Sequence, residues 1–295
     1  MAFRWKTIYE ITTHPLTKKR PFSALIRYIR FHCAHLLFPY ARIYNWVGPL
    51  KLLISRGDAG LVGNVYTGLY DFEEMGFLLH FLRGKDLFVD VGANTGVYSL
   101  LAAGCVNSNV IAVEPVSATY RRLKGQLLLN GLEKHVDCVQ KAVGVSQDTV
   151  YITNNKGTMN HITLEHTENT QAIDTLPLNM ISSVCPVMLK VDVEGYELPV
   201  LQGAHPFLSD EALKAIIIEI NGSGDRHYHF ADNEIHELLL SYGFHPYAYD
   251  VSLRALSVLS SPRKDQHNTL YLRDLDFVQE RLQKARSFAV LGQSF

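Results

Sequence analysis

The sequence predicts an α/β fold in which strands and helices alternate around a mostly parallel sheet. The runs at 87–91 and 186–192 are continuously apolar, as is typical of strands buried on both faces. Helical patterns such as 117–130 follow such runs, and repeated strand–helix units predict right-handed crossovers with helices on both faces. At 295 residues and 47% hydrophobic content, the chain is long enough for one large domain with a sizeable core.

We expect this domain to span residues 57–295. Helices are predicted over 66–82 (after an initial turn), 96–104, 117–130, 196–203, 231–242 and 275–287, and strands over 87–91, 109–114, 136–140, 186–192 and 214–220. The segment 141–180 differs, because it contains only short β-like runs around the sequence NNKGTMN. Residues 244–251 and 268–274 are expected to pair as a terminal hairpin.

Residues 1–56 form a separate, mostly helical and strongly basic extension in this interpretation. They contain ten lysines and arginines and one acid, Glu10, which gives about +9, whereas the whole chain has a net charge of −1. Leu25, Ile29, Cys33 and Leu36 recur at helical spacing. Such a helix either lies on an anionic membrane surface or packs its apolar face on the main domain. We favour packing on the main domain.

The cysteines indicate the cellular compartment. Cys33, Cys105, Cys138 and Cys185 are scattered without a CxxC spacing, which favours buried free thiols in a reducing cytoplasm. Residues 1–10 lack the apolar core of a signal peptide. We therefore expect a cytoplasmic protein, with membrane association through the extension as the alternative.

The loop after the first buried strand identifies the ligand class. It reads Gly92-Ala93-Asn94-Thr95-Gly96, so Asn94 stands where the middle glycine of a dinucleotide-binding G-x-G-x-x-G loop would allow close approach of a pyrophosphate. No Gly-Lys-Ser/Thr follows, which excludes a P-loop. The loop therefore predicts a ligand without a diphosphate.

The charges around this loop fit an amino acid joined to a ribose. Asp90 favours an ammonium group, and the positive end of helix 96–104 favours a carboxylate. Glu114 ends the next strand, where an acidic residue binds ribose hydroxyls. These three features together predict S-adenosylmethionine.

Four segments resemble the FkbM family of S-adenosylmethionine-dependent methyltransferases over roughly residues 60–274. They are FVDVGANTGVYSL at 88–100, EP at 114–115, KAVG at 141–144 and MLKVDVEGYELPVLQGA at 188–204. The resemblance implies a Rossmann-like, seven-stranded class I methyltransferase sheet with an antiparallel terminal strand. It also implies O-methylation of a hydroxyl on a sugar, glycolipid or natural product. Implied cofactor contacts are Asp90, Gly92, Ala93, Asn94, Thr95 and Gly96, with Glu114 at the ribose and Lys141 and Ala142 near adenine.

Acidic residues at strand ends are the candidates for the reaction site, since an attacking hydroxyl must lose its proton. Asp192 ends the strand 186–192, and Glu194 follows it, either as a catalytic group or as a cap of the next helix. Glu219 ends an otherwise apolar strand, and a carboxylate there needs a substrate or ion as partner. Asp192 is the first choice.

A magnesium ion is an alternative that the residues leave open. Asp192, Glu219 and Asn221 form an oxygen-rich set like the site of catechol-type methyltransferases, and hard oxygen ligands suit Mg²⁺. His227 and His229 lack a third ligand at metal spacing, so we expect them in the acceptor cleft, with a surface loop as the alternative and His227 as a further catalytic candidate. His161 is an alternative base, although we favour a position on the loop surface.

Two other functions compete with transfer to a small molecule or glycan. The basic extension prompts a nucleic-acid methyltransferase, but the acidic remainder of the chain would repel phosphates. A membrane-attached binding protein with an inactive domain is the second alternative, and the intact loop and acids argue against it.

Overall fold

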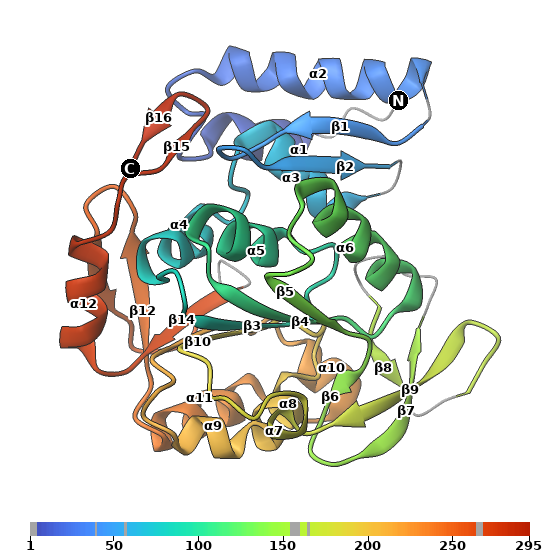
Figure 1. Cartoon of the computed structure of the whole chain (residues 1–295), viewed down its shortest axis with the longest axis vertical. Helices are drawn as coiled ribbons and strands as arrows, with labels where there is room; N and C mark the ends of the chain where they lie inside the picture. Colours follow the sequence, from blue (N-terminus) through green and yellow to red (C-terminus); the bar gives the residue numbers. More distant parts are fainter. Residues whose placement is uncertain (1–4, 39, 56–57, 154–159, 164–165, 264–267) are drawn as a thin grey trace.

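The chain folds around one large sheet, as the computed structural model shows over residues 5–38, 40–55, 58–153, 160–163, 166–263 and 268–295. The sheet consists of β13 (Ala255–Val258), β12 (His245–Asp250), β14 (Asn268–Leu272), β11 (Ala215–Glu219), β10 (Met188–Val191), β3 (Leu87–Val91), β4 (Asn109–Val113) and β5 (Val136–Val139), in this spatial order (Figure 1). The predicted α/β class is confirmed.

The directions of these strands also follow the prediction. Strands β5, β4, β3, β10 and β11 pair in parallel, whereas β14 is antiparallel to both of its neighbours, β11 and β12. The seven expected strands are all present, and β13 adds an eighth at the edge. The hairpin partner of β12 in sequence is therefore β13, and β14 inserts between β12 and β11. The strand order reverses between β3 and β10, which is where such sheets bind ligands.

Helices cover both faces of the sheet, so that the central strands are buried on both sides (Figure 1). One face carries α4 (Phe72–Phe81), α5 (Val97–Leu100), its π-helical continuation η1 (Leu101–Val106) and α6 (Ser117–Asn130). The other carries α7 (Leu178–Ile181), α8 (Glu197–Gly203), α9 (His205–Ser209), α10 (Ser223–Tyr228) and α11 (Asp232–Ser241). At the edge, α12 (Leu275–Gln283) packs on α4, and the chain ends in the short pair β15 (Ala289–Val290) and β16 (Gln293–Ser294).

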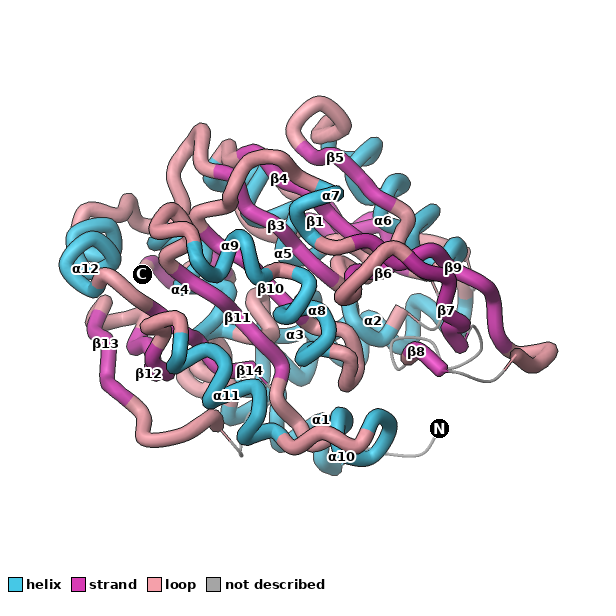
Figure 2. Tube along the Cα trace, turned by 90° about the horizontal axis from the view of Figure 1, so that it is seen from below, coloured by secondary structure: helices cyan, strands magenta, loops and turns pink. Residues whose placement is uncertain are grey.

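A second, four-stranded sheet lies beside the carboxyl ends of the parallel strands (Figures 1 and 2). It comprises β6 (Ala142–Val143), β9 (Thr170–Leu176), β7 (Asp148–Thr153) and β8 (Ile162–Thr163). Strands β7 and β8 correspond to the short β-like runs expected in 141–180, whereas β6 and β9 were not predicted. Ile152, Ile162 and Ile173 form a small core with Val116 and Ala142, which joins this sheet to the main domain.

The N-terminal region contains a hairpin in addition to the expected helices. After α1 (Trp5–Thr13) and α2 (Pro21–Leu37), strands β1 (Arg42–Asn45) and β2 (Lys51–Ile54) pair antiparallel, and α3 (Ala59–Thr67) follows. The backbone N–H of Lys51 donates to Asn130 Oδ1 at 2.8 Å, and that of Leu53 donates to Gln126 Oε1 at 2.9 Å. These contacts hold the hairpin on α6.

Helix α2 corrects the expectation that its apolar residues face the main domain. The face that packs inward carries Ala24 and Phe31, both buried. The predicted stripe of Ile29, Cys33 and Leu36 is exposed instead, and only Leu25 is half-buried. Hydrophobic periodicity identifies an apolar stripe but not the surface it contacts. Among the described residues, no helix is both long and apolar enough to cross a bilayer.

Candidate active site

The turn after β3 requires glycine at two positions. Gly92 has φ +77°, and a Cβ there would lie 1.8 Å from the backbone oxygen of Asp192. Gly96 has φ +88°, and its Cβ would lie 2.4 Å from Leu123 Cδ1. Both features make any larger residue costly, so the glycines allow the loop to lie directly against β10 and α6.

Glu114 holds the other side of this turn from the end of β4. Its Oε2 accepts a hydrogen bond from Asn94 N at 3.0 Å, and its Oε1 accepts one from Val116 N at 2.9 Å. Burial raises the pKa of Glu114 to about 7, although the two backbone donors oppose that shift. Each carboxylate oxygen keeps a lone pair for a further donor.

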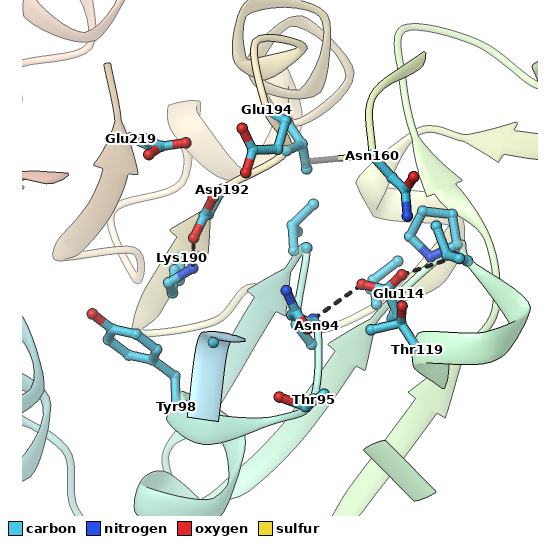
Figure 3. A pocket seen from close by; sticks show the side chains of 18 of the residues that line it. Asn94, Thr95, Tyr98, Glu114, Thr119, Asn160, Lys190, Asp192, Glu194 and Glu219 are labelled. Atoms are coloured by element: carbon cyan, nitrogen blue, oxygen red, sulfur yellow. Dashed lines mark hydrogen bonds and ion pairs between the residues drawn. The ribbon is translucent and has the colours of Figure 1, made fainter. Parts of the chain in front are cut away.

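These residues border a pocket of about 370 Å³ beyond the ends of β3, β4 and β10, within the usual size range of small-molecule sites. The predicted residues that line it are Gly92, Ala93, Asn94, Thr95, Glu114, Lys141, Ala142, Asp192, Glu194 and Glu219. Figure 3 shows that Glu114, Thr119 and Asn160 lie at one side, and Asp192, Glu194 and Glu219 at the other. The pocket therefore has two chemically distinct halves.

Asp90 and Gly96 were predicted to contact the ligand but do not line this pocket. Asp90 is 1% exposed and accepts a hydrogen bond from Ser99 Oγ at 2.7 Å, because its side chain points from β3 toward α5. It also lies beside Lys190 in the register of β3 and β10. The acid thus supports the wall of the pocket from behind.

Sequence reasoning missed two polar residues that line the pocket, Asp71 and Lys190, and left Tyr98, which also lines it, open between a cofactor contact and packing of its helix. Tyr98 donates its hydroxyl to Asp71 Oδ2 at 3.0 Å, and Lys190 Nζ lies 4.8 Å from the centre of the Tyr98 ring. Asp71 precedes α4, where it reads as an ordinary helix-capping residue, yet it accepts no side-chain capping bond there. Only the fold brings it to the ligand site.

Three carboxylates converge at the far end of the pocket. Carboxylate oxygens of Asp192, Glu194 and Glu219 lie within 4.8 Å of one another, and Lys190 Nζ donates to Asp192 Oδ2 at 2.8 Å (Figure 3). We call Asp192, Glu194 and Glu219 the carboxylate cluster. Two of its members follow β10 and the third ends β11, so parallel neighbours in the sheet bring them together.

This crowding alters the acidity of the cluster. Burial, and then the negative charges of Asp192 and Glu194, raise the pKa of Glu219 to about 9. Burial and Asp192 raise the pKa of Glu194 to about 7. Burial alone would favour a neutral Lys190, but Asp192 and Asp90 keep its pKa above the usual value. At neutral pH, Glu219 therefore holds a proton, while Glu194 is poised to accept one.

Glu194 does not cap the helix that follows it. Glu197 does so, because its Oε1 accepts from Val193 N at 3.1 Å and from Gly195 N at 3.0 Å. Glu194 itself has φ +55°, a left-handed conformation that is unfavourable for a residue with a side chain. The backbone strain at Glu194 accompanies a side chain that faces the pocket.

The remaining candidates lie outside the pocket. His227 is exposed on α10 and stacks on His161, with ring centres 4.3 Å apart, while the neighbouring Tyr228 donates to Ile162 O at 2.7 Å. His229 is also exposed. Helix α10 is short, and it turns Tyr228 rather than the histidines inward. His227 therefore does not line the described pocket, and its role in the acceptor cleft stays a prediction.

The predicted oxygen set for Mg²⁺ is also changed. Asn221 Oδ1 accepts a hydrogen bond from Ser223 N at 2.9 Å, and Glu194 takes the third place in the cluster. The ammonium group of Lys190 already contacts one of the three carboxylates. Lys190 therefore offsets part of the negative charge of the three carboxylates, and Mg²⁺ at this cluster stays a prediction.

Comparison with protein families shows to which family the chain with this pocket belongs. The methyltransferase FkbM domain matches residues 90–246, which is more than half of the chain. The chain belongs to the FkbM methyltransferase family. The matched region begins within β3 and ends within β12, so the FkbM domain contains the loop, Glu114 and the carboxylate cluster.

Three solved structures similar to this FkbM chain are distant in sequence. A methyltransferase FkbM from Methylobacillus flagellatus KT is 16% identical with a TM-score of 0.45; the match covers 72% of this chain and 52% of that one, about half its length. A putative rRNA methylase from Clostridium thermocellum is 12% identical (TM-score 0.40, coverage 67% and 90%). A precorrin-6Y C5,15-methyltransferase from Geobacter metallireducens GS-15 is 10% identical (TM-score 0.40, coverage 69% and 89%). No curated protein matches the chain.

Proposed function

We propose that the protein transfers a methyl group from S-adenosylmethionine to a hydroxyl oxygen of a small molecule or glycan. The observation that carries this proposal is the carboxylate cluster, in which Glu194 and Glu219 have raised pKa values, on the opposite side of the pocket from Glu114 (Figure 3). An alcohol loses a proton when it is methylated, so it needs a nearby base. An acceptor whose attacking atom is nucleophilic without losing a proton needs no such base.

The residues that line the pocket favour one orientation of the cofactor. The lone pairs left on Glu114 suit the two ribose hydroxyls, and the wall of Val116, Thr119 and Ala142 suits the adenine ring. Asp71, which lines the pocket beside Tyr98, suits the ammonium group of the methionine part. This orientation directs the sulfonium toward the carboxylate cluster.

The chemistry then depends on alignment and on one proton transfer. Bound S-adenosylmethionine supplies a methyl group activated by the positive sulfur. The acceptor oxygen attacks the methyl carbon in line, the C–S bond breaks and its electron pair stays on sulfur. The hydroxyl proton passes to Glu194, whose pKa of about 7 matches this role near neutral pH. Glu219, with its pKa of about 9, holds the acceptor by a hydrogen bond from its protonated carboxyl group.

The same groups disfavour a nucleic-acid acceptor. Phosphate backbones are bound by lysines and arginines, whereas the acceptor end of this pocket contains three carboxylates and one paired lysine. A neutral, hydroxyl-bearing acceptor fits this charge pattern better.

Calorimetry and a labelling assay test the proposal. We expect tight binding of S-adenosylmethionine and S-adenosylhomocysteine, and no binding of NAD⁺ or ATP. With methyl-labelled cofactor and a panel of sugars, glycolipids and phenols, the product should carry the label as an O-methyl ether. Tight binding of NAD⁺ while both sulfur compounds are ignored would overturn the cofactor assignment. Label on nitrogen or carbon would overturn the assignment of the acceptor atom.

A further inference from the structure

Exposed apolar side chains are concentrated at one end of the molecule. Eighteen large hydrophobic residues are exposed in the described part of the chain, and ten of them lie between Trp5 and Ile43. A monomer normally scatters such residues singly, and a cluster of this kind marks an interaction site. The N-terminal region therefore presents a candidate interaction surface.

The centre of this surface is one face of α2. Phe22, Ile26, Ile29, Cys33 and Leu36 follow each other at intervals of four, three, four and three residues, which places them along one side of the helix. All five are exposed, and Phe22 and Leu36 are 79% and 73% exposed. We call these five residues the outer stripe. In Figure 1, α2 lies at one end of the molecule, with the other elements on one side of it only.

The opposite face of α2 packs against the rest of the protein. Ala24 and Phe31 are buried, Arg27 Nε donates to Tyr66 O at 2.9 Å, and Tyr66 Oη lies 3.2 Å from His32 Nε2. The helix is therefore held in place from within, and the outer stripe cannot rotate inward without breaking these contacts. Folding leaves the stripe outside.

The charge around the stripe indicates the chemistry of the partner. Between residues 5 and 55, eight lysines and arginines face a single acid, Glu10, which lies 3.9 Å from Lys6. Lys18, Lys19 and Arg20 are exposed immediately before Phe22, and Arg30 is exposed within the helix. A helix with an apolar face and flanking basic residues lies in the interface of an anionic bilayer.

A second copy of the chain fits less well. A two-fold contact would pair this surface with itself, and the surface carries Lys18–Arg20 and Arg30, whereas Glu10 is the single acid between residues 5 and 55. Trp5, Tyr9, Phe22 and Tyr40 are all exposed, and aromatic residues of this kind favour the headgroup region of a membrane.

We infer that the outer stripe of α2 and the basic residues beside it dock the protein on an anionic phospholipid surface. The stripe enters the acyl boundary and the lysines and arginines contact the headgroups. This surface lies outside the matched methyltransferase domain, so the inference is independent of the proposed reaction.

Vesicle co-sedimentation of the full chain tests this inference. We expect binding to vesicles of phosphatidylcholine with phosphatidylglycerol, weak binding to phosphatidylcholine alone, and loss of binding as salt increases. The variant Ile26→Gln/Ile29→Gln should bind at least about tenfold more weakly, because it removes the apolar contact. Lys18→Glu/Lys19→Glu/Arg20→Glu should also lose at least about tenfold, through the charges.

The controls change similar residues elsewhere. Leu128 and Leu253 are 68% and 73% exposed but lie outside the N-terminal region, so Leu128→Gln/Leu253→Gln should bind like the unchanged protein. Arg121→Glu/Lys124→Glu/Lys134→Glu tests general charge in the same way, because these three residues are also exposed. Thermal melting of every variant confirms folding.

Three results would overturn the inference. The first is no binding of the unchanged protein to the anionic vesicles. The second is binding that the outer-stripe variant does not weaken, or that the control variants weaken equally. The third is a dimer in sedimentation without vesicles that the outer-stripe variant dissociates, since the stripe would then be an interface between copies.

Discussion

The two halves of the pocket are built in different ways. The half around Glu114 depends on backbone geometry, in which Gly92 and Gly96 take positive φ values and the Glu114 carboxylate accepts bonds from two main-chain N–H groups. The half around Glu219 depends on side chains from separate strands whose charges alter one another. The first half is suited to hold a constant ligand rigidly, and the second to manage a proton.

The largest effect should come from Gly92→Ala, which attacks the backbone half. Its Cβ would lie 1.8 Å from Asp192 O, so the loop must move and binding of S-adenosylhomocysteine should fall by about a hundredfold or more. Gly131→Ala is the matched control, since Gly131 also has a positive φ but no atom within 4 Å of the added carbon. Equal calorimetric affinities for the two variants would contradict the role of Gly92.

Glu194→Gln should affect the side-chain half alone. We expect kcat to fall by about a hundredfold or more, because the base is lost, while cofactor affinity measured by calorimetry stays the same. In the unchanged protein, the rate should rise with pH through about 7, where the raised pKa of Glu194 lets the carboxylate ionise. The variant should lack this rise. A variant that keeps the same pH profile would exclude Glu194 as the base.

Two isosteric changes divide the cofactor site more finely. Glu114→Gln should weaken adenosine and S-adenosylhomocysteine by the same factor, about tenfold, because both ligands carry the ribose. Asp71→Asn should weaken S-adenosylhomocysteine similarly and leave adenosine unchanged, because only the amino-acid part carries an ammonium group. Weaker adenosine binding in Asp71→Asn would show that our orientation of the cofactor is wrong.

The smallest effect is expected from removal of divalent metals. Lys190 already contacts Asp192 at 2.8 Å, so excess chelator should change the methyl-transfer rate by less than about twofold. A loss of activity that Mg²⁺ restores would show that the carboxylate cluster holds a metal.

Most residues that sequence reasoning assigned to the site line the pocket, because they depend on local features. The loop from Gly92 to Gly96 is continuous in sequence, and Asp192 and Glu219 end strands whose carboxyl ends must gather at one edge of the sheet. Asp71 and Lys190 were missed because their approach depends on how α4 and β10 pack, which no local pattern contains. Asp90 was expected in the pocket because it lies near the predicted end of a strand. The sequence does not show to which side of the sheet its side chain points.

The N-terminal region shows the same limit. Helical spacing predicted α2 correctly. The side that packs inward carries Ala24 and Phe31, and neither residue stands out in the sequence from the apolar residues of the exposed side. Strand β9 was missed because its polar residues, such as Gln171 and Asp174, hide the alternation of its buried Ile173 and Thr175.

Helix α3 touches both of these regions. Its residues Gly60 and Asn64 line the pocket, while Tyr66 contacts α2. Helix α3 therefore contacts both the ligand pocket and α2, the helix that carries the outer stripe. Thermodynamic reciprocity then applies: any factor by which a lipid surface tightens cofactor uptake is the factor by which cofactor tightens adhesion to that surface.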